Sequence, residues 1–200
     1  MKYNLNFHSK YYYQNTQILK NKFNIKNYDR LIEIESDFTC LRLAELYVKP
    51  INGKFDIKHF LNIHKYIFQD VYDFAGKIRF EEISKGNTHF CKTVFIMENL
   101  NVIFGFLKNL NIFSNMPLPV FIENSAYFLS ELNMIHPFIE GNGRAIREFF
   151  RCICEYNNLE INWQYADKDT ILEAFIGSAR ENNDKLKLLL DKIINIGVGP

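Results

Sequence analysis

Apolar residues recur at helical spacing along most of the chain. Between residues 28 and 47, leucine, isoleucine and phenylalanine return roughly every three or four positions, which predicts a helix with one buried face. Pro50 and Gly53 then interrupt the pattern. Asp56 is a suitable N-cap for a second helix over residues 57–72, and Gly76 marks the end of this region.

The next segment, residues 77–96, has the composition of a β-hairpin. β-Branched and aromatic residues in KIRFEEI are followed by Lys85, Gly86 and Asn87, and then by THFCKTVFI. Two such runs around a glycine-containing turn predict a hairpin. It is the one convincing strand pair in the sequence pattern.

Helical patterns return after the hairpin, over residues 97–113, 121–134, 143–156, 167–182 and 184–196. Pro137 lacks an amide hydrogen and disfavours helical angles at His136, so one helix should stop there. The chain is therefore predicted to be mainly α-helical, with about six to eight helices and one hairpin. The expected organisation is an N-terminal extension, itself helical, over residues 1–30, a domain over residues 31–196 and a tail over residues 197–200.

Composition narrows the class of protein. The 200 residues suit one domain, with 48% hydrophobic and 24% charged residues. A formal net charge of +1 argues against duplex DNA or an anionic membrane surface as a bulk electrostatic partner. The four cysteines form no CxxC pair, which favours free thiols in a reducing compartment. Because neither an apolar signal region nor a membrane-length apolar run is visible, the expected location is cytoplasmic, with secretion into a host cell as the alternative.

The stretch HPFIEGNGRAIR carries the candidate chemistry. At roughly 100° per residue, the helix expected after Asn142 has an apolar face and an opposite face that includes Arg144 and Arg147. Gly141 and Gly143 permit backbone angles that other residues resist, so several amide N–H groups can point at one anion. The helix dipole and the guanidinium groups add to this effect, which predicts a polyphosphate site.

Two further side chains of this stretch complete a reaction site. A polyphosphate usually brings Mg²⁺, for which Glu140 is the obvious carboxylate ligand. His136 has the side chain best suited to act as a general base near neutral pH. A base, a metal-binding acid, a phosphate site and two arginines are what nucleotidyl or phosphoryl transfer to a hydroxyl requires.

The stretch is identified as the Fic motif, HPFx(D/E)GNGRxxR, because it matches that motif at every defined position. Two other segments resemble the same family. The run GKFDIKHFLNIHKYIFQDVYDFAGKIR resembles its lead-in, and ISKGNTHF resembles its β-hairpin flap. The resemblance extends over roughly residues 32–194. It implies an all-α Fic fold of about six to eight helices, with the hairpin as a flap over the active site.

The resemblance implies a protein adenylyltransferase, which transfers AMP from ATP to a tyrosine, serine or threonine hydroxyl of a target protein. By position in the motif, His136 would deprotonate that hydroxyl, and Glu140 would hold Mg²⁺ between the α- and β-phosphates. The residues implied to bind the triphosphate are Gly141, Asn142, Gly143, Arg144 (at the β-phosphate) and Arg147 (at the γ-phosphate). The flap would hold an extended target segment by strand addition, with Lys85 and Gly86 as its expected contact residues.

The family also suggests partners. Many members are inhibited by a helix with the motif (S/T)xxxE(G/N), and no serine or threonine of this chain has a glutamate four residues further on. We therefore expect a bacterial toxin that is held inactive by a separate small antitoxin with this motif. The alternative is an inhibitory helix absent from this sequence. The favoured target is a type II topoisomerase subunit, and no direct nucleic acid or membrane partner is expected.

Two other activities stay open. The Doc branch of the family transfers the γ-phosphate and carries lysine where this chain has Gly143, so the glycine favours AMP transfer over a phosphotransferase. The other alternative is a non-catalytic Fic-like module that only binds a nucleotide. The presence of both His136 and Glu140 argues against such a module.

Overall fold

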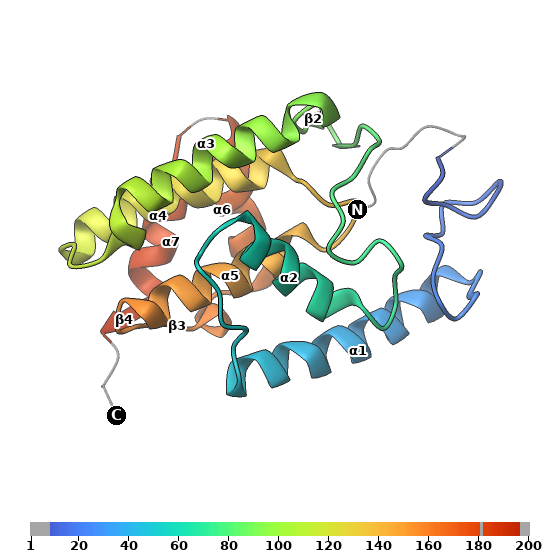
Figure 1. Cartoon of the computed structure of the whole chain (residues 1–200), viewed down its shortest axis with the longest axis horizontal. Coiled ribbons are helices and arrows are strands. Elements are labelled where there is room, and N and C mark those ends of the chain that lie inside the picture. Colours follow the sequence, from blue (N-terminus) through green and yellow to red (C-terminus); the bar gives the residue numbers. More distant parts are fainter. Residues whose placement is uncertain (1–8, 181, 197–200) are drawn as a thin grey trace. The chain divides into compact units, whose positions relative to one another are not determined.

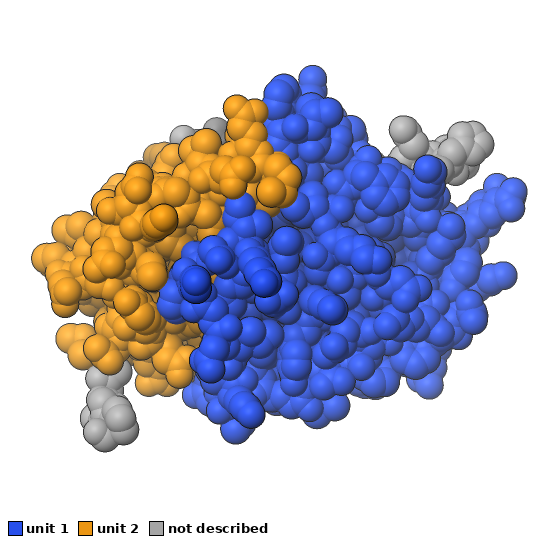
Figure 2. Space-filling view, viewed as in Figure 1, with its two compact units in different colours: residues 1–96, 136–145 blue, residues 97–135, 146–200 orange. Residues whose placement is uncertain are grey.

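The computed structural model describes residues 9–180 and 182–196. Contacts divide the chain into two compact units (Figure 2): unit 1 comprises residues 1–96 and 136–145, and unit 2 comprises residues 97–135 and 146–200. The described part of the chain contains seven α-helices and only short strands. The predicted mainly α-helical fold is therefore confirmed.

Unit 1 contains two complete helices and a hairpin (Figure 1). Helix α1 (Tyr28–Val48) begins where the Asn27 side chain accepts a hydrogen bond from a first-turn amide. Helix α2 (Ile57–Phe68) begins in the same way at Asp56, as predicted. The two helices pack against each other, and α2 buries its apolar face.

The predicted hairpin is present. Strand β1 (Ser84–Lys85) pairs antiparallel with β2 (Thr88–His89). Gly86 lies in the turn with a φ of 58°, the left-handed conformation that glycine adopts at no steric cost. A short 3₁₀ helix, η1 (Thr93–Phe95), follows and leads into α3.

The N-terminal extension is not the helix that the sequence analysis expected. Residues 9–27 form turns and one isolated antiparallel bridge between Tyr12 and Leu19, and residues 1–8 lie outside the described part of the chain. Tyr11 is buried here, with its ring stacked on Phe80 at 4.7 Å and edge-on to Phe74 at 5.7 Å. Tyr11 is thus held by contacts with a segment that is distant in the sequence, and residues 9–27 do not form a helix. The boundaries of the domain and the tail remain predictions.

Helices also dominate unit 2, which contains a second small sheet that was not predicted. Its elements are α3 (Ile96–Asn109), η2 (Asn111–Phe113), α4 (Leu118–Ile135), α5 (Asn142–Tyr156), β3 (Leu159–Ile161), η3 (Trp163–Tyr165), α6 (Lys168–Arg180), α7 (Asp184–Ile193) and β4 (Ile194–Ile196). α3 and α5 begin in unit 1 and continue into unit 2. β3 and β4 pair antiparallel.

The core of unit 2 is built from aromatic rings. Phe128 packs edge-on against Phe104 and Phe113, with ring centroids 5.8 and 6.3 Å apart, and tilted against Phe149 at 6.2 Å. These four rings are almost fully buried. The high phenylalanine content of the sequence is thus used, at least here, to fill a core.

Several predicted helices extend beyond the observed ones. The helix expected over residues 57–72 ends at Phe68, and the one expected over residues 97–113 ends at Asn109 and is followed by η2. The helix expected over residues 184–196 ends at Ile193, and β4 begins at the next residue. Among the described residues, no helix combines the length and the apolar character needed to cross a membrane.

Candidate active site

The loop of residues 136–141 joins α4 to α5 and carries the predicted base and acid. α4 ends at Ile135, as Pro137 predicts. His136 follows in a left-handed conformation with a φ of 48° and is 6% exposed. Its ring is stacked on Phe90, with centroids 3.8 Å apart and an angle of 19° between the planes. The backbone and a neighbouring ring therefore fix the orientation of this imidazole.

Gly141 and Asn142 shape the end of the loop. Gly141 has a φ of 81°, and a Cβ atom there would lie 2.1 Å from the Phe68 ring, so only glycine fits. The Asn142 side chain accepts a hydrogen bond from the Phe138 amide at 2.9 Å and donates one to the Phe138 carbonyl at 2.8 Å. The Asn142 side chain thus closes the loop, and its backbone amide is the group that the predicted anion nest would use.

The N-terminus of α5 presents backbone amides next to this loop. Helix geometry leaves the first-turn amides without acceptors inside the helix, and the first bond within α5 runs from Ala145 to the Gly141 carbonyl at 3.1 Å. Gly143 lies in this first turn. Gly141 and Gly143 thus lie at the helix N-terminus, where an anion nest would form. The Gly141 amide already donates to the Glu140 carboxylate at 2.8 Å.

Arg144 is held by groups from α1. Its guanidinium donates to the Glu35 carboxylate at 2.6 Å and to the Thr39 hydroxyl at 3.1 Å. The Thr39 hydroxyl hydrogen is directed to the Glu35 carbonyl at 2.7 Å, so an oxygen lone pair faces the arginine. Tyr72 donates to the other Glu35 oxygen. The guanidinium also lies over the Phe68 ring, 4.6 Å from its centroid.

Glu140 lies in an electrostatically strained position. Burial raises the pKa of its carboxyl group, the nearby Glu35 carboxylate raises it further, and Arg144, whose guanidinium is 3.6 Å away, opposes this shift. Lys85 of the hairpin also lowers the pKa of Glu140, because its positive charge favours the ionised carboxylate. A cation beside Glu140 would relieve the repulsion between the two carboxylates.

The residues present fit Mg²⁺ only together with a phosphate ligand. Within residues 9–180 and 182–196, no group of three His, Cys, Asp or Glu side chains is arranged to hold a metal ion. Mg²⁺ commonly takes one or two carboxylates and completes its octahedron with phosphate oxygens and water. Glu140, with 31% of its side chain exposed, can supply one such carboxylate.

His64 supports the 136–141 loop through contacts with Phe138 and Glu140, a role that was not predicted from the sequence. It is fully buried and stacks on Phe138 with ring centroids 3.6 Å apart. Its Nδ1 accepts a hydrogen bond from the Gly76 amide at 2.8 Å, so Nε2 carries the proton and donates to the Glu140 carbonyl at 3.0 Å. Burial lowers the pKa of His64 to about 3, so the ring is neutral at physiological pH.

The remaining predicted site residues lie outside this loop. Lys85 and Gly86 form the tip of the hairpin in unit 1, and the space around the missing Gly86 side chain is open. Arg147 lies three residues beyond Arg144 on α5, in the part of the helix that belongs to unit 2, and it is half-buried. Unit 1 therefore contains all the predicted site residues except Arg147.

A helical fold with a histidine–acid loop, a glycine-flanked helix N-terminus and a short hairpin defines a Fic-type domain. The model of the Fic/DOC family matches residues 54–154, and the chain belongs to that family. The relatives include protein adenylyltransferase VbhT of Bartonella schoenbuchensis, 34% identical over 175 residues, 88% of this chain and 37% of VbhT. They also include the probable protein adenylyltransferase Fic of Escherichia coli K12, 28% identical over 92% of each chain.

Solved structures show the same fold. The N-terminal Fic domain of a VirB-translocated Bep effector from Bartonella quintana, solved with bound ADP, has a TM-score of 0.87 at 24% identity and covers 94% of this chain and 95% of its own. The type IV secretion system effector BepA has a TM-score of 0.86 at 25% identity and covers 92% of this chain and 68% of its own.

Proposed function

We propose that this protein is a protein adenylyltransferase that transfers AMP from ATP to a tyrosine, serine or threonine hydroxyl of a target protein. The observation that carries the proposal is the junction of the 136–141 loop with α5, where His136, Glu140 and the helix N-terminus adjoin. The relatives named as protein adenylyltransferases support it, and the E. coli relative matches over 92% of its length.

His136 is the proposed general base. The target hydroxyl oxygen forms a bond to the α-phosphorus, and the bond from this phosphorus to the oxygen that bridges to the β-phosphate breaks. Pyrophosphate leaves with that electron pair, and the hydroxyl proton passes to the imidazole. Stacking on Phe90 and the left-handed backbone hold the ring in one orientation, so it need not be ordered at the moment of reaction.

The phosphates bind at the start of α5. The backbone amides of Gly141, Asn142 and Gly143 donate to phosphate oxygens, and the helix dipole favours their charge. A guanidinium has five N–H donors, and Glu35 and Thr39 accept one each from Arg144, so further donors remain for the β-phosphate. Arg147, one helical turn on, binds the γ-phosphate in this proposal.

Glu140 is the proposed Mg²⁺ ligand. When bound, Mg²⁺ neutralises phosphate charge and favours the departure of pyrophosphate. Glu140 would hold the ion through a carboxylate oxygen. If the oxygen that accepts from the Gly141 amide at 2.8 Å turned toward the ion, that amide would become available to a phosphate oxygen.

The hairpin of β1 and β2 is the proposed binding site for the target. β1 and β2 pair with each other in a two-stranded sheet, and addition of a strand to a sheet edge is a common way to hold an extended peptide. Lys85 and Gly86 are the residues we expect to contact that segment. An extended backbone beside His136 would present one hydroxyl to the α-phosphorus.

The identity of the target protein and of the inhibitory partner is proposed from the family resemblance alone. We infer a bacterial toxin controlled by a separate antitoxin that carries the (S/T)xxxE(G/N) helix, with a type II topoisomerase subunit as the target. A purified chain that transfers AMP freely and is silenced by such a helix supports this; a chain that is tightly inhibited by itself contradicts it.

The position of the transferred label tests the reaction. The purified chain is incubated with Mg²⁺ and a bacterial lysate, together with ATP labelled at either the α- or the γ-phosphate, and His136→Ala serves as the control. AMP transfer predicts a protein band labelled only from the α position and absent with the variant. Label from the γ position alone would instead establish a Doc-like phosphotransferase, and no label from either would favour the binding module.

A further inference from the structure

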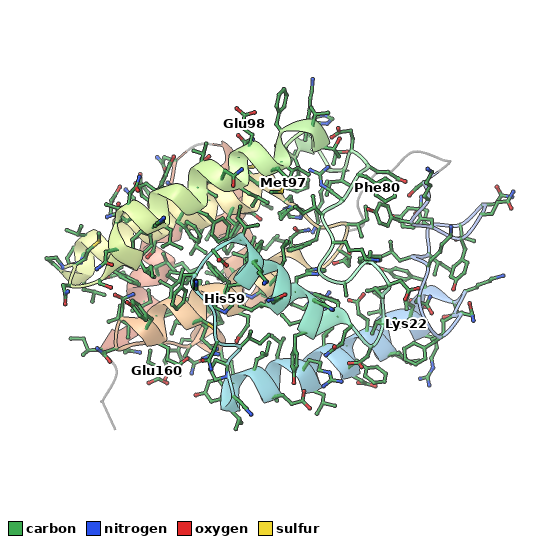
Figure 3. The ribbon with its side chains drawn as sticks, in the orientation of Figure 1. Lys22, His59, Phe80, Met97, Glu98 and Glu160 are labelled. Atoms are coloured by element: carbon green, nitrogen blue, oxygen red, sulfur yellow. The ribbon has the colours of Figure 1, made fainter. Side chains whose placement is uncertain are left out.

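Arg79 is buried, and removing its charged guanidinium from water costs free energy that other contacts must offset. Its side chain is 0% exposed, and its Nη1 lies 3.7 Å from the carboxylate of Glu82, whose side chain is 59% exposed. The next residue, Phe80, is exposed (Figure 3). Charged groups are rarely buried unless hydrogen bonds compensate for lost hydration. The compensation comes here from backbone carbonyl groups.

The guanidinium of Arg79 joins three separate points of the backbone. Nε donates to the His136 carbonyl at 2.8 Å, Nη1 donates to the Glu81 carbonyl at 2.8 Å, and Nη2 donates to the Cys91 carbonyl. The backbone amide of Arg79 also donates to the Pro137 carbonyl at 2.8 Å. One rigid, planar group thus connects the catalytic loop to both ends of the hairpin.

Two neighbouring contacts reinforce the connection. The Glu82 carboxylate accepts hydrogen bonds from the amide and the hydroxyl of Thr93, at 2.9 and 2.8 Å, which ties the two ends of the hairpin together. Phe90, at the end of the hairpin, stacks on the His136 ring. The hairpin is therefore fixed to His136 through a ring contact and through the Arg79 guanidinium.

We propose that Arg79 is a positioning residue that sets the location of the target-binding hairpin relative to His136. This inference rests on the proposed function, because the hairpin is taken to hold the target and His136 to be the base. Its side-chain hydrogen bonds go to the carbonyl groups of His136, Glu81 and Cys91, at the proposed base and at the two ends of the hairpin. We therefore expect Arg79 to affect the placement of the target hydroxyl more than the binding of ATP.

Lysine cannot replace this arginine. Its ammonium group keeps the charge but lacks the fixed fork that reaches three carbonyls at once. In Arg79→Lys, the hairpin and the catalytic loop should move independently. Lys77→Gln is the matched control, because it removes an exposed cation two residues away on the same segment.

Hydrogen exchange read by mass spectrometry tests the connection without any need for activity. Arg79→Lys should increase exchange at least tenfold in residues 81–93 and in residues 136–141, with little change in residues 142–156, whereas Lys77→Gln should match the wild type. Faster exchange throughout the chain, or in neither segment, would overturn the proposal. If Arg79→Lys does not fold, Phe90→Leu, which weakens the other connection, should give the same local pattern.

Kinetics then separate positioning from general structural damage. With α-labelled ATP and the lysate band as acceptor, Arg79→Lys should lower the rate of label transfer at saturating ATP at least tenfold. The KM for ATP and the affinity for AMPPNP should stay within twofold of the wild type. Equal losses in ATP affinity and transfer would refute a positioning role. A wild-type chain that transfers no label would refute the proposed function alone, since the exchange result is obtained separately.

Discussion

Lowering the pH from 7 to 5 should destabilise the fold through His64. The ring is fully buried, and both of its nitrogens are used when it is neutral, with Nδ1 accepting from Gly76 and Nε2 donating to the Glu140 carbonyl. A second proton would sit on Nδ1, where the partner is itself a donor. Protonation therefore breaks the contact with the Gly76 amide, whereas Nε2 can still donate to the Glu140 carbonyl.

The size of the effect follows from the shift in the pKa of His64. Burial lowers this pKa from 6.5 to about 3 in the folded chain, so the unfolded state binds more protons at acid pH. The stabilisation is complete above pH 6.5 and is lost as the pH falls from there toward 3. Each pH unit in this window costs about 1.4 kcal/mol, which gives about 2 kcal/mol between pH 7 and pH 5.

Urea unfolding followed by circular dichroism at both pH values measures this loss, with His64→Gln as the matched variant. Glutamine does not titrate, so the variant should lose about 2 kcal/mol less than the wild type over the same interval. His59, whose pKa burial also lowers, contributes equally to both proteins and cancels. Equal losses in the two proteins would refute the account of His64.

Three further substitutions, two in unit 1 and one in unit 2, test the packing within each unit by urea unfolding. Gly141→Ala should lower the free energy of unfolding by about 2–4 kcal/mol, because the left-handed backbone and the Phe68 ring both exclude a Cβ atom; an unchanged value would contradict this. Tyr72→Phe should cost about 1–3 kcal/mol, since it removes a donor to the buried Glu35 carboxylate. Ser125→Ala should leave stability equal or raise it by up to about 1 kcal/mol, because the buried hydroxyl finds no partner among the described residues; a clear loss would show a missed contact.

Local signals predicted much of the fold. Asp56 caps α2 and Pro137 ends the preceding helix, because both effects depend only on neighbouring residues. Where distant contacts decide the structure, the prediction was wrong. The Ile-Asn-Ile segment at residues 194–196 is as compatible with a helix as with a strand, and pairing with β3, more than 30 residues earlier, makes it a strand. Residues 9–27 likewise lack the expected helix, and Tyr11 in this segment packs on Phe80.

The candidate site also combines residues that the local sequence indicated with residues that only distant contacts bring in. The residues of HPFIEGNGRAIR are contiguous, so their order alone indicated a phosphate site beside a base and an acid. The residues that support them come from other segments: Glu35 from α1, His64 from α2 and Arg79 from the lead-in to the hairpin. A single buried polar residue has no characteristic spacing, so these three could be noticed only as polar residues within apolar surroundings.

The central claim is that His136 performs chemistry and does not bind the nucleotide. It is tested most directly by comparing wild type and His136→Ala in two assays: calorimetric binding of AMPPNP with Mg²⁺, and transfer of α-label from ATP. The account predicts that AMPPNP affinity stays within about twofold and that transfer falls at least a hundredfold, in line with typical contributions of a general base. Full transfer by the variant, or loss of AMPPNP binding together with transfer, would contradict the assignment.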